Sequence, residues 1–336
     1  MERISLRSLL DGDADAAAAV RASMRSRSFV ILNNDTGDGA TGRAEAAALQ
    51  LFERAAGNEG VKQVLLEAAE ATGLRELGFS STTAKFTFNY KHGPACPPTL
   101  WPSEEESRQH STLANCFDFL ERVCVASYSV LQYDGDHEAC ADFLNSHGAL
   151  GVPASGVSSS LLQCFYYANT HSLDQNPNCG EHVDQGFLSI EPATKVPGLQ
   201  VYDFAAASWL DVDVALAPTD LVLFCAESLQ RFSRSEYKGT VHRVGKDAQH
   251  RPRLSMVYKM RHRAIEEFEA ASQQQFVHYH DGLGGGGGHG GGDSAEEIVR
   301  QQVLGMGFSV AQVEAAIAAV GYEGGADAVV EFLLGQ

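Results

Sequence analysis

The chain has 336 residues, 44% of them hydrophobic, and its formal net charge is −18. Such an acidic chain argues against a nucleic-acid-binding protein, because binding to phosphates needs clustered cations. No run approaches the roughly 18 apolar residues of a membrane span, and the N-terminus lacks the apolar core of a signal peptide. The seven cysteines form no CxxC pair, which indicates reduced thiols. We therefore expect a protein of the cytoplasm or nucleus that binds neither nucleic acid nor membrane.

Helices dominate the predicted elements of the first half of the chain. The alanine-rich residues 13–27 favour a helix, and residues 28–34 follow as a strand that ends in turn formers. Three further segments have helical apolar spacing, at residues 44–55, 61–73 and 110–132.

Short strands dominate beyond residue 160. The segments are rich in β-branched and aromatic residues and are separated by turn residues, a pattern typical of a sandwich or jelly roll. A helix over residues 263–276 is predicted to close this part of the chain. The predicted strands are residues 161–170, 186–192, 199–204, 220–226, 239–245 and 253–260.

A glycine-rich segment divides the chain. Residues 282–293 contain nine glycines in twelve positions, and Gly has the most backbone freedom to lose, so a flexible linker is predicted. Residues 1–281 form one predicted domain and residues 294–336 a second, smaller one. The second has three short amphipathic segments, the middle one with a capping box at Ser309 and Gln312. We expect a small all-α three-helix bundle there.

The segment CGEHVDQGFLSI, residues 179–190, places two metal-ligand side chains at the start of an apolar run. In a strand, residues i and i+2 point to the same face, so His182 and Asp184 can reach one ion together. Of the twelve histidines, His182 is the one that begins an H-x-D. A third ligand candidate, His242, stands inside the alternating segment GTVHRVG.

Two histidines and one carboxylate are typical of the facial triad of non-heme Fe(II) oxygenases, which leaves adjacent coordination positions open. Zinc hydrolases use the same ligand types, but usually within an HExxH on a helix, which this chain lacks. An isolated H-x-D is common by chance, so the metal hypothesis depends on the motifs around it.

Three further motifs support the hypothesis. Arg253 and Ser255 are again i and i+2, and a guanidinium fork with a hydroxyl on one strand face suits a carboxylate. Tyr167, fifteen residues before His182, adds a phenolic donor. The third motif is VPGLQVYD, residues 196–203, with Trp209 after it.

Together these motifs resemble the isopenicillin N synthase-like branch of the Fe(II)/2-oxoglutarate-dependent oxygenases, over about residues 3–277. The family pattern is a Tyr pair, H-x-D, P-G-L-Q-V, a Trp, a Ser followed by H-R, and R-x-S. Two positions depart from it, since Phe165 stands where Asn is common and Ala226-Glu227 replace a Gly-Asp. The pattern is carried by Tyr166–Tyr167, His182–Asp184, Pro197–Val201, Trp209, Ser233–Arg243 and Arg253–Ser255.

The resemblance implies an α+β fold, a double-stranded β-helix (jelly roll) with flanking helices. It implies Fe(II) as the metal, 2-oxoglutarate as the co-substrate, and oxidation of a small molecule coupled to decarboxylation of 2-oxoglutarate. The implied iron ligands are His182, Asp184 and His242, and the implied contacts of the 2-oxoglutarate distal carboxylate are Arg253 and Ser255, with Tyr167 assisting.

The C-terminal tail resembles a ubiquitin-associated (UBA) domain. The Met306-Gly307-Phe308 loop and the Leu333-Leu334 pair match the places where that family presents its apolar ubiquitin-binding patch. The resemblance implies ubiquitin or a ubiquitinated protein as a partner. Core packing is the alternative role for Met306 and Phe308.

Three functions stay open from the sequence. The leading one is a 2-oxoglutarate-dependent oxygenase tethered to a ubiquitin-binding module. A second is an iron enzyme that keeps R-x-S but oxidises its substrate without 2-oxoglutarate. A third is a ubiquitin-binding adaptor with a catalytically idle β-fold, against which the intact triad argues. The sequence does not identify the substrate.

Overall fold

The structure, a computed structural model, describes residues 3–73, 76–82, 85–93, 104–132, 157–169, 177–204, 206–261 and 310–321, together with residues 329 and 332. The chain divides into two compact units, Met1–Phe268 and Glu269–Gln336. Within the described residues, no helix is both long enough and apolar enough to cross a membrane.

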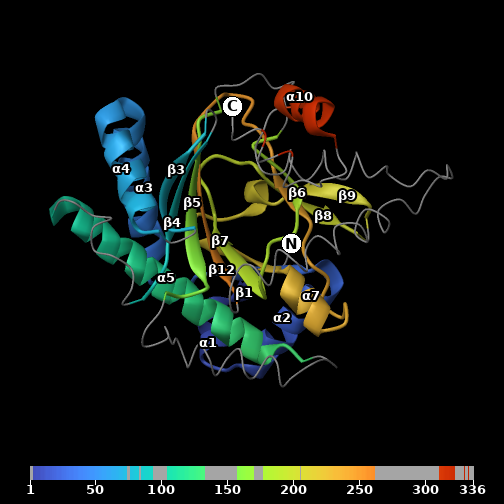
Figure 1. The fold of residues 1–336 in the computed structure, drawn as a ribbon. Helices are drawn as coiled ribbons and strands as arrows, with labels where there is room; N and C mark the ends of the chain where they lie inside the picture. Colours follow the sequence, from blue (N-terminus) through green and yellow to red (C-terminus); the bar gives the residue numbers. More distant parts are fainter. Residues whose placement is uncertain are drawn as a thin grey trace. The chain divides into compact units, whose positions relative to one another are not determined.

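An eight-stranded sheet forms the centre of the first unit (Figure 1). Its order is β1-β2-β10-β7-β12-β5-β4-β3. β1 pairs with β2 in parallel, and the other neighbours pair antiparallel. The strands are β1 (Arg3–Ser5), β2 (Phe29–Asn33), β3 (Gly78–Ser81), β4 (Lys85–Tyr90), β5 (Leu161–Tyr167), β7 (Leu188–Pro192), β10 (Asp220–Cys225) and β12 (Arg253–Met260).

A second, antiparallel sheet has the order β6-β11-β8-β9. Its strands are β6 (Cys179–His182), β8 (Leu199–Asp203), β9 (Ser208–Asp211) and β11 (His242–Val244). Alternate residues of the two sheets pack against each other, as in a jelly roll. The apolar cluster between them consists of Phe29, Ile31, Leu199, Val201, Val212, Val222 and Phe224.

Helices cover the outer face of the large sheet (Figure 1). They are α1 (Leu6–Leu10), α2 (Ala14–Arg27), α3 (Ala40–Gly57), α4 (Glu59–Ala71) and α5 (Glu104–Val130). Ser5, Asp13 and Asn58 cap α1, α2 and α4, each accepting a backbone N–H three residues on. Two short elements, the 3₁₀ turn η2 (Asp213–Ala215) and α7 (Glu227–Phe232), connect strands.

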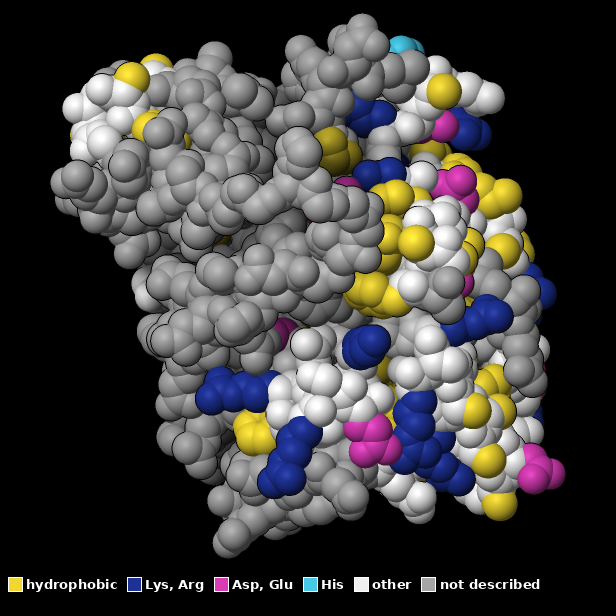
Figure 2. Space-filling model, turned by 90° about the vertical axis from the view of Figure 1, so that its right-hand side faces the viewer, with side chains coloured by type: hydrophobic (Ala, Val, Ile, Leu, Met, Phe, Trp, Pro, Cys, Tyr) yellow, Lys and Arg dark blue, Asp and Glu magenta, His cyan; other side chains and the backbone are white. Residues whose placement is uncertain are grey.

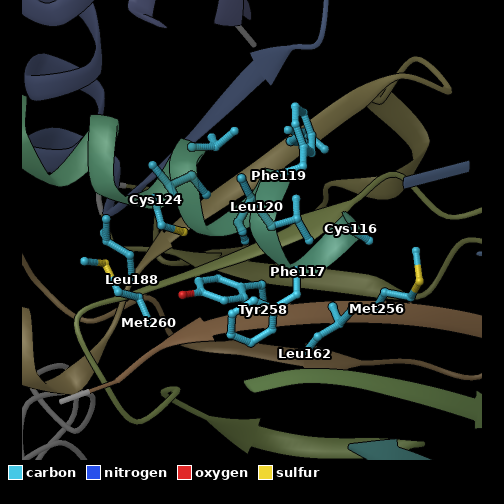
Figure 3. Close-up of a cluster of buried hydrophobic side chains, with 14 of the residues drawn as sticks. Cys116, Phe117, Phe119, Leu120, Cys124, Leu162, Leu188, Met256, Tyr258 and Met260 are labelled. Carbon is cyan, nitrogen blue, oxygen red and sulfur yellow. The ribbon is translucent and has the colours of Figure 1, made fainter. Parts of the chain in front are cut away.

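The strand β12 is buried on both faces, and its two faces differ in chemistry. One set of alternate residues points to the helices, where the Tyr258 ring meets Phe117 of α5 edge-on at 5.0 Å between ring centroids (Figure 3). This set joins the main apolar core and consists of Leu254, Met256, Tyr258 and Met260. The other set faces the small sheet and consists of Arg253, Ser255, Val257 and Lys259.

The surface drawn in Figure 2 shows Lys and Arg side chains in several separate groups, with hydrophobic and acidic side chains between them. The described part of this face therefore presents no continuous basic stripe of the kind that follows a phosphate backbone.

Most predicted elements of the first unit are confirmed. The predicted helices correspond to α2, α3, α4 and α5. α3 begins four residues earlier than predicted, at Ala40, and α5 begins six residues earlier, at Glu104. The predicted strands correspond to β2, β5, β7, β8, β10, β11 and β12. The hairpin of β3 and β4 was not predicted, although Phe86, Phe88 and Tyr90 alternate in its second strand. The predicted helix at 263–276 and the linker at 282–293 lie outside the described residues.

One helix of the second unit is described. It is α10 (Val310–Val320), which coincides with the predicted helix that follows Ser309, and it buries Ala316 and Ile317. The other two predicted helices lie largely outside the described residues, so the three-helix bundle stays a prediction. The proposed ubiquitin-contacting residues also lie outside them: Met306, Gly307, Phe308, Leu333 and Leu334.

Candidate active site

The strand pairing of the small sheet brings the two candidate histidines together. β6 ends at His182, which is in register with His242 at the start of β11. Asp184 follows β6 rather than lying within it, so the two ligands do not share one strand, as the i and i+2 argument had expected. A turn follows at Gly186, where φ is +110° and an added Cβ would lie 2.5 Å from the Met260 carbonyl oxygen. A side chain at this position would be strained and would clash, so the turn requires glycine.

The three predicted metal ligands converge. The ligand atoms of His182, Asp184 and His242 all lie within 4.8 Å of one another. His182 Nε2 lies 3.5 Å from Asp184 Oδ1, and His242 Nε2 lies 4.0 Å from Asp184 Oδ2. Asp184 and His242 are buried, whereas His182 is partly exposed. Among the described residues, this is the one group of three such side chains close enough to hold a metal ion.

Hydrogen bonds orient both imidazoles for metal binding. The distance from His182 Nδ1 to the Gly180 carbonyl oxygen is 2.9 Å, and that from His242 Nδ1 to the Thr240 carbonyl oxygen is 2.9 Å. A carbonyl oxygen can only accept, so Nδ1 carries the hydrogen in each ring, and in the neutral form Nε2 offers its lone pair to a metal. The Phe224 ring stacks on His242 at 5.1 Å between ring centroids and restricts its rotation.

The charges at the triad depend on its neighbours. Burial lowers the pKa of His182, but the charges of Cys179 and Asp184 outweigh it and raise that pKa to about 10. Burial, together with the positive charge of His182, lowers the pKa of His242 to about 4. Burial alone would raise the pKa of Asp184, but Lys259 and the two imidazoles hold it well below its usual range. A metal ion that binds here displaces a proton from His182, so metal affinity should rise with pH.

Lys259 is a site residue that the motif analysis missed. Its Nζ lies 2.7 Å from Asp184 Oδ1, and its side chain is largely buried. It occupies the same face of β12 as Arg253 and Ser255, so the two-residue alternation of the strand was a usable signal. Lys259 places a positive charge next to the candidate metal-binding carboxylate.

A second polar cluster lies around Arg253, on the same inner face. Arg253 is fully buried, and its Nη2 donates to Glu191 Oε1 at 2.9 Å and to Asp213 Oδ2 at 3.2 Å. Its Nε donates to the Val196 carbonyl oxygen at 3.2 Å. Gly198 leaves room for the guanidinium, since an added Cβ would lie 3.0 Å from Arg253 Cδ and Nε. The carboxylates of Glu191 and Asp213 were not singled out from the sequence.

One atom of this guanidinium has no partner in the part of the chain that the structure describes. Arg253 Nη1 is buried and has no hydrogen-bond partner among the described residues, and an unpaired buried donor is costly. Tyr167 is directly opposite Arg253 in the pairing of β5 with β12, and Ser255 lies two residues along the same face. Two imidazoles with one carboxylate suit Fe(II), and a buried guanidinium donor near two hydroxyls suits a carboxylate, so the residues present fit both groups.

The Phe165 position, a departure from the family pattern, also lies on the inner face. Phe165 is opposite Ser255, and its ring stacks on Tyr167 with centroids 6.0 Å apart. Lys85 of β4 lies over the Phe165 ring, with its Nζ 5.3 Å from the ring centroid. An apolar ring and a cation therefore stand where the pattern commonly has an amide.

Residues 158–262 match the family model of the 2OG-Fe(II) oxygenase superfamily. This segment contains the triad and the Arg253 cluster. No curated protein matches the chain.

Solved structures share the fold at low sequence identity. A full-length Neurospora crassa protein, solved in complex with alpha-KG, is 19% identical, with a TM-score of 0.57, covering 77% of this chain and 84% of that one. The rice dioxygenase for auxin oxidation is 19% identical, with a TM-score of 0.57. The match covers 77% of this chain and 82% of the rice chain. A 2OG-Fe(II) oxygenase family protein of Caulobacter crescentus is 18% identical, with a TM-score of 0.56. The match covers 78% of this chain and 86% of the Caulobacter chain.

These likenesses establish the α+β double-stranded β-helix fold. The matched segment and the converged triad add the chemistry that the fold alone does not give. Residues 158–262 are therefore similar to the 2OG-Fe(II) oxygenase superfamily, and the chain is an enzyme that uses Fe(II) and 2-oxoglutarate.

Proposed function

We propose that His182, Asp184 and His242 hold the Fe(II), and that Arg253 holds the distal carboxylate of 2-oxoglutarate with help from Ser255 and Tyr167. The observation that carries the proposal is the convergence of the three ligand atoms within 4.8 Å, on the same inner face as Arg253 Nη1, which has no hydrogen-bond partner among the described residues. When bound, Fe(II) and 2-oxoglutarate supply oxidative decarboxylation coupled to oxidation of a substrate.

The chain's own residues have positioning roles in this proposal. The Gly180 and Thr240 carbonyls keep the imidazole Nε2 atoms directed at the metal position. The apolar layer beneath them, which includes Phe224 and Val201, keeps water out of the inner side of the site. The buried Arg253 fixes one end of 2-oxoglutarate, which leaves its 2-oxoacid end for the metal.

The test is turnover of 2-oxoglutarate by the full chain with Fe(II), ascorbate and oxygen, followed as succinate. We expect wild-type protein to form succinate, faster in the presence of the substrate. Asp184→Ala should form none, while Asp211→Ala, a change of an exposed carboxylate on β9, should leave the rate unchanged. Equal succinate formation by wild type and Asp184→Ala would refute the assignment.

The substrate we propose is a small polar molecule. The inner face continues past the triad with Lys85, Asn89 and Gln163, and Gln163 Nε2 donates to Asn89 Oδ1 at 3.1 Å. The Neurospora protein has been solved with thymine and with 5-formyluracil, and the rice protein acts in auxin oxidation, so these fold relatives take small molecules. Comparing metabolite extracts before and after incubation with wild-type and Asp184→Ala protein would identify the compound consumed. Equal loss of every compound with both proteins would count against a small-molecule substrate.

We propose separately that the tail is a UBA domain that binds ubiquitin. Support comes from the Met306-Gly307-Phe308 and Leu333-Leu334 motifs and from α10, which occupies the predicted middle helix. Labelled ubiquitin titrated with the full chain should show chemical-shift changes that Met306→Ala and Leu334→Ala weaken. A chain truncated before Gly282 should cause no shifts but should keep its succinate formation. Unchanged ubiquitin spectra at millimolar full-length chain would rule out this role.

A further inference from the structure

The Arg253 cluster holds more negative charge than one guanidinium can balance. Glu191 and Asp213 both contact Arg253 Nη2, and all three side chains are buried. The distal carboxylate of 2-oxoglutarate would be a third carboxylate on the same cation. Like charges held close together in a buried site cannot all stay ionised, and Arg does not lose its proton in proteins. A carboxylate of the chain must therefore become neutral when 2-oxoglutarate binds.

The hydrogen bonds decide which carboxylate this is. Asp213 Oδ2 accepts the backbone N–H groups of Gly198 and Leu199, at 2.9 and 2.8 Å, as well as Arg253. Three donors stabilise the negative charge on Asp213, which also anchors the start of β8. In the described part of the chain, the side-chain hydrogen bond of Glu191 is the single one from Arg253. Glu191 is thus the carboxylate that takes a proton most readily.

The packing keeps Glu191 in place. It lies in β7, opposite Val222 of β10, with β12 on the other side of β7, and it is buried. Swinging the side chain out to water would need these strands to separate. Glu191 must therefore resolve the charge conflict where it stands.

We propose that Glu191 competes with 2-oxoglutarate for Arg253, and that Glu191 must be neutral for the distal carboxylate to bind. This inference rests on the proposed placement of that carboxylate at Arg253. Binding of 2-oxoglutarate then brings one proton from solvent onto Glu191. The residue sets the affinity for 2-oxoglutarate by its charge, as a positioning and selectivity residue rather than a catalytic one.

In the protein without 2-oxoglutarate, Glu191 already takes up its proton near neutral pH. Burial raises the pKa of Glu191 to about 7, against the opposing effect of Arg253. The charged and titratable groups around it are Arg253 on β12, Asp213 on η2, Asp184 beyond β6 and Tyr167 on β5. A third carboxylate at Arg253 raises the pKa of Glu191 further. Affinity for 2-oxoglutarate is therefore full below pH 7 and falls as the pH rises above it.

The experiment measures binding, not turnover. The full chain is loaded with Mn(II), and calorimetry gives the affinity for 2-oxoglutarate at pH 6 and pH 8. The matched ligand is 2-oxopentanoate, which has the same 2-oxoacid end but lacks the distal carboxylate. Glu191→Gln removes the charge at nearly constant size. The control variant is Glu121→Gln, a partly buried glutamate on α5 that contacts Tyr258 on the outer side of the large sheet.

The wild-type chain should bind 2-oxoglutarate roughly tenfold more weakly at pH 8 than at pH 6, because about a tenth of Glu191 with a pKa of about 7 is neutral at pH 8. Glu191→Gln should bind roughly tenfold more tightly than wild type at pH 8 and about equally at pH 6. The affinity for 2-oxopentanoate should not depend on pH and should be the same in wild type and Glu191→Gln. A pH effect caused by proton release at the metal ligands would instead appear with both 2-oxoacids. Glu121→Gln should behave as wild type.

Each contrary outcome has a distinct meaning. Equal 2-oxoglutarate affinity of wild type and Glu191→Gln at pH 8 overturns the inference and leaves the proposed function standing. If Glu191→Gln does not fold, the wild-type comparison decides, and the same pH dependence for both ligands overturns the inference. No binding of 2-oxoglutarate by wild type at pH 6, or unchanged binding in Arg253→Lys, overturns the placement at Arg253 and the inference with it.

Discussion

The two faces of β12 have the same burial and opposite chemistry. The face toward α5 carries Met256 and Tyr258 in an apolar core, whereas the face toward the small sheet carries Arg253 and Lys259 among buried carboxylates. Apolar packing on the first face holds the sheet in its register. The second face carries buried charges, and a buried ion pair contributes little net stability compared with apolar residues of similar size. On this account, the outer face of β12 contributes mainly to stability and the inner face to the proposed site.

The largest effect expected on the inner face is loss of metal binding. His182→Ala, Asp184→Ala and His242→Ala should each abolish tight binding of one Fe(II) per chain, since two remaining ligands hold a metal weakly. Anaerobic calorimetry measures this, and circular dichroism should show that the fold is kept. Unchanged Fe(II) affinity in all three variants would contradict this assignment, because the inner face would then not be the metal site.

The outer face should respond in stability instead. Phe117→Ala removes a buried ring that packs on Tyr258, so we expect about 3–5 kcal/mol lower unfolding free energy. Denaturant unfolding measures the loss. At a temperature where the variant is folded, its Fe(II) affinity should equal that of wild type. Weaker Fe(II) binding by folded Phe117→Ala would mean that the two faces are not separable.

A smaller effect is expected at the far end of the inner face. Arg253→Lys keeps the positive charge but loses the planar guanidinium that binds a carboxylate through two N–H groups. The affinity for 2-oxoglutarate should therefore fall by about 1.5–3 kcal/mol. Fe(II) binding should stay unchanged, because the triad does not include Arg253. Calorimetry with Fe(II) and, separately, with 2-oxoglutarate measures the two affinities independently. A parallel loss of Fe(II) affinity would show that the variant disturbs the whole interior rather than one subsite.

The sequence predicted those parts of the site that follow from local periodicity. Arg253 and Ser255 stand two residues apart and share one face of β12, as strand alternation predicts. His182 and Asp184 also converge, although Asp184 lies beyond the end of β6. The same alternation along β12 extends to Lys259, which was missed because the known motif stops at Ser255.

The residues that sequence reasoning could not find depend on long-range pairing. Glu191 reaches Arg253 across 62 positions of the chain, through the placement of β7 beside β12. Asp213 lies in a short 3₁₀ turn, where no periodic pattern indicates which way a side chain points. The hairpin of β3 and β4 is different, because the alternation of Phe86, Phe88 and Tyr90 indicates a strand from the sequence alone.

The central claim is that the inner face binds Fe(II) and 2-oxoglutarate together. The direct measurement is the visible absorption of the full chain, without oxygen, as 2-oxoglutarate is added to Fe(II)-loaded protein. We expect a metal-to-ligand charge-transfer band that saturates at one equivalent in wild type and is missing in Asp184→Ala. Wild-type protein that binds Fe(II) but shows no band at saturating 2-oxoglutarate would contradict the account.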